Sequence, residues 1–344
     1  MSFYTKLKYR DMAHSPIARF ESAVAVVADK MYVIGGHMEP DLVATDAVFA
    51  FCPMDNEWTQ KRNAPKAVSH LTAAVLDDRY IWLAGGYEGQ HPGTGIQCTM
   101  CYDAIEDRWE DGPPLPSIRA SGGLALIGRH LHYFDGLDAD RTTNRDDHWV
   151  LDVDKPDQWR AQAPMPLARS HAATCVVDGK IYAIGGHFGH DIPGQPGKIA
   201  PEADSDYVHM FDPADDCWHE VAPLTRRRSH CEPGSFARDG KIICIGGRNN
   251  AATARCRCEQ NLMVHLLRRL RRKLDVKMGL RPKIAALDDV ISYDPVRDKW
   301  SDIGRLPMTL YAPAAAIIKD QVIVTNSGQK GWQHPSHRTL ILDM

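Results

Sequence analysis

The heptapeptide MYVIGGH, at residues 31–37, is an apolar run that ends at two glycines and a histidine. The same pattern recurs in IWLAGGY (81–87), IYAIGGH (181–187) and IICIGGR (242–248), and HYFDGL (132–137) and VIVTNSGQ (322–329) are weaker copies. The doublets and their weaker equivalents begin at residues 35, 85, 135, 185, 246 and 327. A period near fifty residues predicts an array of repeated supersecondary units.

Each unit follows one plan of four short strands. A small-residue strand such as ARSHAATCVV (168–177) precedes the strand that ends at the glycines, and a third strand such as YVHMFDPADD (207–216) ends in an Asp-rich turn. Short strands with turn signals at regular spacing are typical of blades stacked around an axis. A tryptophan marks the fourth strand of five units, and we expect it to pack between neighbouring blades. The series is Trp58, Trp109, Trp159, Trp218 and Trp300.

The two ends of the chain complement each other. The last unit supplies TLYAPAAAII (309–318), QVIVTNS (321–327) and RTLILDM (338–344), but it has no fourth strand. Tyr9 stands seven residues before Pro16, which is the spacing of tryptophan and proline in four of the other five units; the exception is Trp218, where Thr225 takes the place of proline. The N-terminal strand is therefore predicted to complete the sixth blade, and such closure removes an exposed sheet edge.

Composition narrows the class of protein. The 344 residues are 44% hydrophobic, which is typical of a globular chain, and the formal net charge of −3 argues against nucleic-acid binding by bulk charge. We read no signal peptide in the first residues and no apolar run long enough to span a membrane, so membrane contact is not expected. Nine cysteines in such a chain are interpreted as reduced thiols of a cytoplasmic protein.

The glycine doublets, the aromatic residues before several of them (Tyr32, Tyr182) and the spaced tryptophans resemble the kelch repeat family, within the galactose oxidase-like kelch superfamily. The resemblance covers nearly the whole chain. It implies an all-β, six-bladed kelch-type β-propeller that forms a single domain over residues 1–344. Kelch-like propellers include binding modules and enzymes, among them a sialic-acid mutarotase, copper sugar oxidases and iron-dependent specifier proteins, so the fold does not fix the function.

In an up-and-down blade, the start of the innermost strand and the end of the second strand meet at one face. Alignment of the units therefore places two rings of side chains around one mouth of the central channel. The first ring is Glu21, His70, Ser121, His171, His230 and Ala312. The second ring follows the glycines and is His37, Tyr87, Leu137, His187, Arg248 and Gln329. Arginines stand two residues before the first ring, at Arg19, Arg119, Arg169 and Arg228.

These rings predict a pocket for a small polar or anionic ligand, which we expect to be a sugar or a sugar acid. Imidazole and guanidinium groups donate hydrogen bonds to such ligands. The alternative is that the same side chains simply fill a narrow channel mouth. The predicted ligand-binding residues are Arg19, His37, Tyr87, Arg119, Arg169, His187, Arg228, Arg248 and Gln329. The predicted catalytic residues of an isomerase, mutarotase or lyase are His171, His230 and Glu232, because their side chains can exchange protons.

A narrower hypothesis is a metal site. His70, His171 and His230, with Glu21 as a fourth group, offer ligand types that suit Zn, Fe, Mn or Cu. These residues come from separate units, so no short spacing motif supports the site. For Glu232, the alternatives are a general base, a further metal ligand, and an ion pair with a nearby arginine.

Two long segments follow glycine doublets. Residues 187–207 are rich in Gly, Pro and acidic residues and are predicted to rim the pocket. Residues 249–289 form a predicted insertion in the fifth blade, where leucines recur every four residues from Leu262 and six basic residues accompany them over 261–280. This pattern predicts a basic amphipathic helix, which either docks on the propeller or binds a protein partner. A non-catalytic protein-interaction scaffold is thus the alternative function.

Overall fold

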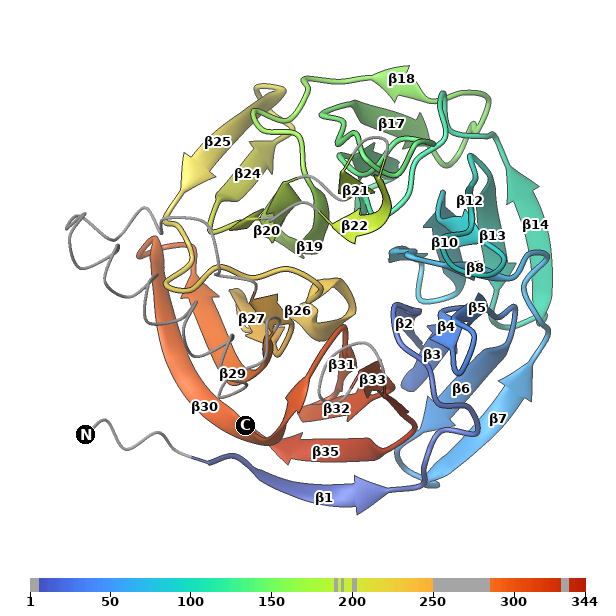
Figure 1. Cartoon of the computed structure of the whole chain (residues 1–344), viewed down its shortest axis with the longest axis vertical. Coiled ribbons are helices and arrows are strands. Elements are labelled where there is room, and N and C mark those ends of the chain that lie inside the picture. Colours follow the sequence, from blue (N-terminus) through green and yellow to red (C-terminus); the bar gives the residue numbers. More distant parts are fainter. Residues whose placement is uncertain (1–5, 189–190, 193–194, 200–202, 250–284, 329–333) are drawn as a thin grey trace.

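In the computed structural model of this chain, the structure describes residues 6–188, 191–192, 195–199, 203–249, 285–328 and 334–344. These residues form an all-β fold in which the sheets are arranged around a common centre, like the blades of a propeller (Figure 1). The innermost strands lie near the axis and the outermost strands lie at the rim. Within this described part, no helix is long and apolar enough to cross a membrane.

Six larger antiparallel sheets contain most of the described strand residues, and in the first five the main strands run in chain order from the axis to the rim. The first sheet comprises β2 (Ala23–Val27), β3 (Lys30–Ile34), β6 (Val48–Cys52) and β7 (Glu57–Lys61). The second comprises β9 (Ala73–Leu76), β10 (Tyr80–Ala84), β13 (Thr99–Asp103) and β14 (Arg108–Gly112). The third comprises β15 (Gly123–Ile127), β16 (His130–Phe134), β17 (His148–Asp152) and β18 (Arg160–Ala161).

The fourth and fifth sheets each carry one additional short strand. The fourth sheet comprises β19 (Ser170–Val177), β20 (Lys180–Phe188), β23 (Ala203–Asp204), β24 (Val208–Asp212) and β25 (Cys217–Val221). The fifth comprises β26 (Ser235–Arg238), β27 (Lys241–Ile245), β28 (Arg248–Asn249), β29 (Ala285–Asp294) and β30 (Lys299–Leu310).

The sixth sheet contains both ends of the described chain. It comprises β31 (Ala314–Ile318), β32 (Gln321–Thr325), β35 (Thr339–Asp343) and β1 (Lys8–Met12). Strand β1 is antiparallel to β35, with Lys8 opposite Asp343 and Met12 opposite Thr339. The strand from the N-terminal region therefore occupies the outer edge of the sheet that the C-terminal region begins.

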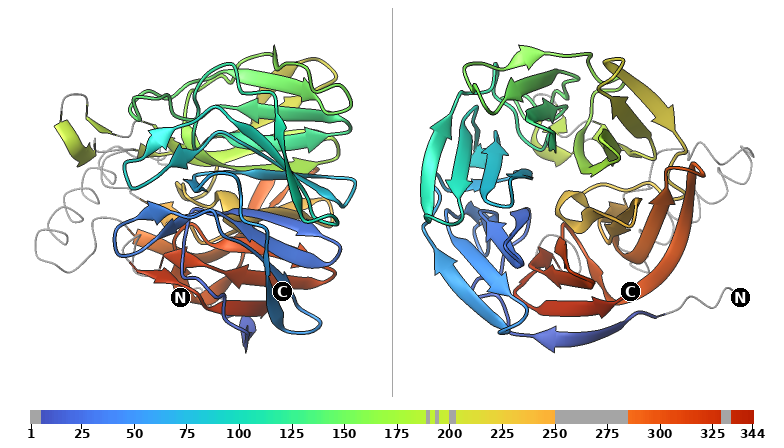
Figure 2. Two further views of the ribbon diagram at one scale, coloured as in Figure 1. Left: turned by 90° about the vertical axis from the view of Figure 1, so that its right-hand side faces the viewer. Right: turned by 180° about the vertical axis from the view of Figure 1, so that it is seen from behind.

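Short strand pairs extend beyond the ends of the larger sheets. The hairpin β21–β22 projects from one face of the ring, as the side view of Figure 2 shows. The short elements are β4 (His37–Met38), β5 (Val43–Ala44), β8 (Val68–Ser69), β11 (Tyr87–Glu88), β12 (Thr94–Gly95), β21 (Asp191–Ile192), β22 (Gln195–Ile199), β33 (Ser327–Gly328), β34 (Pro335–Ser336) and the 3-10 turn η1 (Glu232–Gly234).

The glycine doublets connect each sheet to the next one. Gly35 and Gly36 have φ of +64° and +99°, in the left-handed region that glycine adopts at low cost. A Cβ at Gly35 would lie 2.3 Å from the carbonyl oxygen of Val68 in the next repeat, so a side chain cannot fit there. The amide of Gly36 donates to that same carbonyl at 2.8 Å. The doublet is therefore required by a close backbone contact between neighbouring repeats.

The tryptophans make a second, regular connection at the rim. In each case the indole N–H donates to a backbone carbonyl of the preceding repeat, at 2.8–3.1 Å. Trp58 reaches Ala13, for example, and Trp300 reaches Ala222. The structure thus shows the packing between blades that the sequence predicts for these residues.

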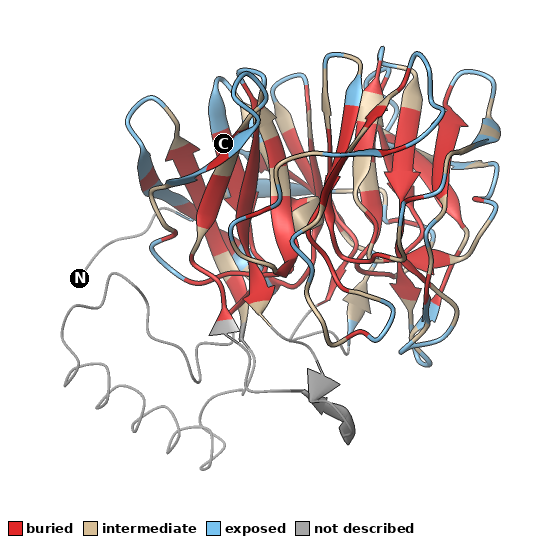
Figure 3. Cartoon of the chain, turned by 90° about the horizontal axis from the view of Figure 1, so that it is seen from above, coloured by how far each residue is buried: buried red, intermediate tan, exposed pale blue. Residues whose placement is uncertain are grey.

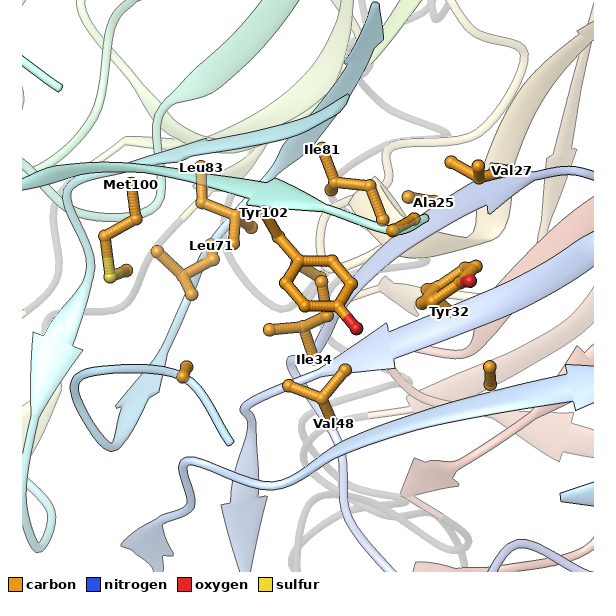
Figure 4. Packing of buried hydrophobic residues seen from close by; sticks show 14 of the residues in the cluster. Ala25, Val27, Tyr32, Ile34, Val48, Leu71, Ile81, Leu83, Met100 and Tyr102 are labelled. Carbon is orange, nitrogen blue, oxygen red and sulfur yellow. The ribbon is translucent and has the colours of Figure 1, made fainter. Parts of the chain in front are cut away.

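Apolar side chains fill the space between neighbouring sheets. Figure 4 shows one such cluster, in which Tyr32 and Ile34 of β3 lie beside Tyr102 of β13 and Leu83 of β10. The inner strands of the sheets are mostly buried, and the exposed residues lie in the turns and on outermost strands such as β1 and β7 (Figure 3). Because each core cluster spans two sheets, the stability of one blade depends on its neighbours.

Two further sequence predictions concern the helix at 261–280 and the cysteines. The predicted helix at 261–280, with most of the insertion at 249–289, lies outside the described residues. All the described cysteines are free thiols, in agreement with the prediction of reduced cysteines. Burial raises the pKa of the Cys101 thiol to about 12, so this sulfur remains protonated and unreactive at neutral pH.

Candidate functional site

The first predicted ring exists as a distinct backbone feature at one end of the innermost strands. All six of its residues have a positive φ, between 45° and 59°, although none is glycine. The amide of His70 donates to the carbonyl of Glu21 at 3.2 Å, and the amide of Ser121 donates to that of His70 at 3.2 Å. The same link joins His171 to Ser121 at 2.9 Å and Ala312 to His230 at 3.0 Å. Left-handed non-glycine residues cost free energy and gather at functional sites.

Glu21 is the centre of the polar side chains in this ring. One of its oxygens, Oε2, lies 3.0 Å from Nε2 of His70 and 3.3 Å from Nδ1 of His37. The other oxygen, Oε1, lies 3.6 Å from Nε2 of His230 and 3.5 Å from the hydroxyl of Tyr311. The carboxylate is 9% exposed, so these contacts occur in a poorly solvated environment where electrostatic interactions are strong.

A serine precedes each histidine of the first ring and contacts the Nδ1 atom of that histidine. The Oγ–Nδ1 distances are 2.9 Å for Ser69–His70, 3.2 Å for Ser170–His171 and 2.9 Å for Ser229–His230. Ser69 also lies 2.9 Å from Nε2 of His37, which belongs to the second ring. The repeated Ser-His dipeptide is a sequence signal for these orienting contacts, and our sequence analysis did not use it.

Three further imidazoles form a separate stacked group. The ring centroids of His171 and His230 are 4.1 Å apart, and those of His171 and His187 are 4.5 Å apart. All three side chains are buried. The mouth of the channel is thus filled by two neighbouring sets of imidazoles, one centred on Glu21 and one centred on His171.

Glu232 owes its position to two extra residues in the fifth repeat. Thr174 and Ser235 occupy equivalent places, since each pairs with the residue two positions before a glycine doublet. Thr174 follows His171 by three residues, whereas Ser235 follows His230 by five. The additional Glu232 and Pro233 form the 3-10 turn η1 instead of continuing the strand.

This turn places Glu232 on the wall of the central channel. A cavity is lined by Glu21, His70, Leu71, Thr72, Ser121, Glu232, Pro233 and Ala312. A second cavity shares Leu71, Thr72, Glu232 and Pro233 with the first one. Glu232 therefore lies between two adjoining cavities, and its buried Oε2 atom makes no hydrogen bond to any described residue.

The pKa values of the two carboxyl groups in the first cavity are shifted in opposite directions. Burial, with a smaller contribution from the negative charge of Glu21, raises the pKa of Glu232 to about 8. Burial acts in the same direction on Glu21, but His70 and His37 outweigh it, and the pKa of Glu21 falls to about 2. At neutral pH one carboxyl group is therefore protonated and the other is ionised, an arrangement that is typical of acid–base sites.

The arginines before the first ring do not face the cavity. Arg19 is fully buried and donates to the carbonyls of Val33, Gly35 and Ala47 at 2.7–3.0 Å. Arg228 bonds to Asp289 at 2.7 Å.

The other two arginines of the series are held in the same way. Arg169 donates to the carbonyl of Ala183 at 3.0 Å and lies 2.8 Å from Nδ1 of His209, while Arg119 pairs with Asp147. All four guanidinium groups connect strands, which leaves them outside the set of residues that line the cavity.

Residues of the second ring are held by partners from other loops. Arg248 lies 3.0 Å from Asp204, and Asp204 accepts from Ser229 at 2.8 Å, which connects this arginine to His230. The guanidinium of Arg141 lies 3.8 Å from the ring centroid of Tyr87.

Sequence reasoning missed Arg141 because it lies in the variable segment between β16 and β17, which the alignment of the two rings does not include. Gln329, also predicted for this ring, lies outside the described residues.

Of the predicted catalytic residues, Glu232 lines the cavity, whereas His171 and His230 lie beside it in the stacked group. Of the predicted metal ligands, Glu21 and His70 come together, with His37 as their third neighbour, and His171 and His230 lie together with His187. The four predicted residues therefore belong to two neighbouring groups, which the contact between Glu21 and His230 connects.

Comparison with protein families gives two matches. Residues 112–331, more than half of the chain, match the family model described as N-acetylneuraminate epimerase. Residues 18–65 match the model of the kelch motif. The two matched ranges lie in different repeats, and both agree with the predicted resemblance to the kelch repeat family.

Individual proteins extend this result. The chain is 28% identical over 254 residues to a kelch repeat-containing protein of Arabidopsis thaliana, covering 70% of this chain and 58% of that protein. It is 26% identical over 173 residues to kelch-like protein 36 of Rattus norvegicus, covering 49% of this chain and 27% of that protein. The solved structure of YjhT has the same fold, with a TM-score of 0.69, 13% identity, and coverage of 96% of this chain and 95% of the other.

Proposed function

Because the chain belongs to the kelch-repeat family whose model is described as N-acetylneuraminate epimerase, we propose that it is an epimerase or mutarotase that acts on a sugar acid of the N-acetylneuraminate type. The proposed site is the cavity at the channel mouth that Glu21, His70 and Glu232 line. The observation that carries the proposal is Glu232, a carboxyl group with a raised pKa on the wall of that cavity. The proposed architecture is a six-bladed propeller closed by β1, which the pairing of β1 with β35 supports.

The interconversion of sugar anomers needs two proton transfers. When the ring opens, the anomeric hydroxyl loses a proton, the ring oxygen gains one, and the bond between the anomeric carbon and the ring oxygen breaks. Closure on the other face of the carbonyl reverses these steps. A group with a pKa near the working pH is the most effective catalyst for such transfers.

Glu232 can carry out both transfers. At neutral pH its carboxyl group is protonated, so one oxygen can donate to the ring oxygen while the other accepts from the anomeric hydroxyl. The neighbouring Glu21 is ionised and cannot donate, which leaves Glu232 as the acid. The partial enclosure of the cavity strengthens these hydrogen bonds, because less water competes for them.

The test is exchange NMR spectroscopy of the α and β anomers of N-acetylneuraminate. We expect the protein to accelerate the exchange, and we expect Glu232→Gln to lower the catalysed rate by roughly 10²–10⁴-fold, the usual contribution of a general acid–base group. Glu106→Gln is the matched control, because Glu106 is a surface glutamate whose side chain is 61% exposed, and its rate should equal that of the wild type. If the wild-type protein does not accelerate the exchange of this or related sugar acids, the proposal is wrong and the scaffold alternative is favoured.

A further inference from the structure

Glu21, His37 and His70 bring three ligand-type atoms within 4.8 Å of one another. Oε2 of Glu21 is 3.0 Å from Nε2 of His70 and 3.3 Å from Nδ1 of His37. Two ligands bound at right angles to an ion, with bonds of about 2.1 Å, lie about 3.0 Å apart, and a tetrahedral angle gives about 3.4 Å. The observed separations of the carboxylate from the two imidazoles fall within this range.

The opposite sides of both imidazoles are fixed by one hydroxyl group. Oγ of Ser69 lies 2.9 Å from Nε2 of His37 and 2.9 Å from Nδ1 of His70. Histidines that bind metal ions nearly always donate the hydrogen on their other ring nitrogen to an orienting partner, and this contact fixes the tautomer. A serine oxygen has two lone pairs, so Ser69 can accept from both rings.

The four close contacts of this cluster need one more hydrogen than its neutral side chains supply. Four close contacts join Ser69, the two imidazoles and Glu21, and each contact needs one hydrogen between its two heavy atoms. The hydroxyl and the two neutral imidazoles supply three hydrogens. Nδ1 of His37, on a side chain that is 2% exposed, makes no hydrogen bond to a described residue. A proton or a metal ion between Nδ1 of His37 and Oε2 of Glu21 would make this close contact favourable.

We propose that Glu21, His37 and His70 bind a divalent transition-metal ion, with Ser69 as the residue that orients both imidazoles. Two histidines and one carboxylate are a ligand set that proteins use for zinc and for non-haem iron, with further coordination positions left open. Glu21 and His70 also line the cavity that contains Glu232, so the ion would lie at the cavity wall. The site does not depend on the proposed epimerase activity, which assigns its proton transfers to Glu232.

The neighbouring group of His171, His187 and His230 is a weaker candidate. Their ligand atoms also lie within 4.8 Å of one another, but the group has no carboxylate. The rings of His171 and His230 are stacked at 4.1 Å with an angle of 22° between their planes. Stacked rings direct their nitrogens side by side, whereas rings that bind one ion point toward it. The rings of His37 and His70 are at 76° to each other, which suits convergence.

The experiment uses the full chain after treatment with a chelator. Cobalt(II) is titrated while its visible absorption is recorded, and zinc(II) binding is measured by calorimetry. We expect one equivalent of ion with a Kd below about 10 μM, a binding free energy near −7 kcal/mol. Glu21→Gln and His37→Asn should weaken binding by roughly 100-fold, and Ser69→Ala should weaken it by roughly 10-fold.

His187→Asn is the matched control, since it removes one imidazole from the neighbouring group, and it should leave the Kd unchanged. Circular dichroism verifies the fold of each variant. The proposal is overturned if the wild-type chain binds neither ion, which would indicate a protonated imidazole, or if His187→Asn abolishes binding while His37→Asn retains it. Glu232→Gln should bind the ion like the wild type, so failure of this proposal is distinguishable from failure of the proposed activity.

Discussion

The fourth and fifth sheets begin in the same way and then differ. Each has a Ser-His dipeptide at the channel mouth, with the histidine in a left-handed conformation, and the two histidine rings stack at 4.1 Å. In the fourth sheet, His171 lies within the long strand β19, which begins at Ser170. After His230 the chain forms the turn η1, and β26 begins only at Ser235.

This difference shows how a repeat gains a chemical group without losing its fold. The hydrogen bonds between repeats are the same in both sheets, since the second glycine of each doublet donates to the next repeat at 2.8–2.9 Å. Two additional residues after His230 change the inner edge of the fifth sheet, where they introduce a carboxyl group into a channel that the second repeat lines with Leu71, Thr72 and Ala73. Repetition thus provides the scaffold, and the departure from repetition provides the candidate acid.

The strongest test removes the two additional residues of the fifth repeat. Deletion of residues 232–233 gives the fifth sheet the length of the fourth, and we expect a strand in place of η1. The chain should remain folded, because β19 shows that the shorter connection fits the blade. Catalysed anomer exchange should fall to the rate in buffer, a larger loss than that of Glu232→Gln, because the cavity wall is lost along with the acid. Exchange NMR and circular dichroism measure the two outcomes.

A variant with unchanged length separates the two effects of that deletion. Replacement of Glu232 and Pro233 by two glycines keeps the spacing and removes both side chains. Activity in the deletion variant equal to that of the wild type would contradict the importance of this turn, whatever the double-glycine variant does.

The pH dependence of stability provides the next largest effect. The pKa of Glu232 is raised to about 8 in the folded protein from an ordinary value of 4.5. The neutral form is favoured in the fold, so its contribution to stability is complete below pH 4.5 and is lost as pH rises toward 8. Glu232→Gln lacks this loss. Its melting temperature should therefore match that of the wild type near pH 4 and exceed it by several degrees at pH 8–9.

The control for this experiment is the other carboxyl group of the cavity. The pKa of Glu21 is lowered to about 2, so its contribution is present above pH 4.5 and is lost as pH falls toward 2. Glu21→Gln should thus destabilise the protein at neutral pH and have less effect near pH 2. The prediction is wrong if the melting temperatures of the wild type and Glu232→Gln change in parallel from pH 4 to pH 9. That result would show that the carboxyl group of Glu232 is solvated like a surface group.

The sequence predicted the repeat and the meeting of the two rings, because glycine doublets and tryptophans have rigid backbone and packing requirements. It did not predict the direction of the arginines. In a regular strand, Arg19 and Glu21 would share one face, since side chains alternate. The left-handed conformation of Glu21 interrupts this alternation, and Arg19 bonds to strand-end carbonyls instead. A backbone angle of this kind has no signature in residue type when the residue is Glu or His.

The sequence also could not predict that the histidines form two neighbouring groups. Alignment of repeats gives the order of residues around a ring but not the rotamer of each side chain. His70 is held toward Glu21 by Ser69, whereas His171 stacks on His187 and His230. The serine before each ring histidine was visible in the sequence, and its contacts with the imidazoles follow only from the side-chain geometry.

The smallest expected effect compares the two Ser-His dipeptides directly. Ser229 lies 2.9 Å from Nδ1 of His230 and donates to the buried carboxylate of Asp204 at 2.8 Å, while Ser170 lies 3.2 Å from Nδ1 of His171. A hydrogen bond to a buried charge contributes about 1.5–3 kcal/mol, and a neutral one contributes about 1 kcal/mol. Ser229→Ala should therefore lower the free energy of unfolding by about 1 kcal/mol more than Ser170→Ala, as measured by urea denaturation. Equal losses in the two variants would mean that the contact with Asp204 adds nothing, and that the fourth and fifth sheets differ only in the two residues after His230.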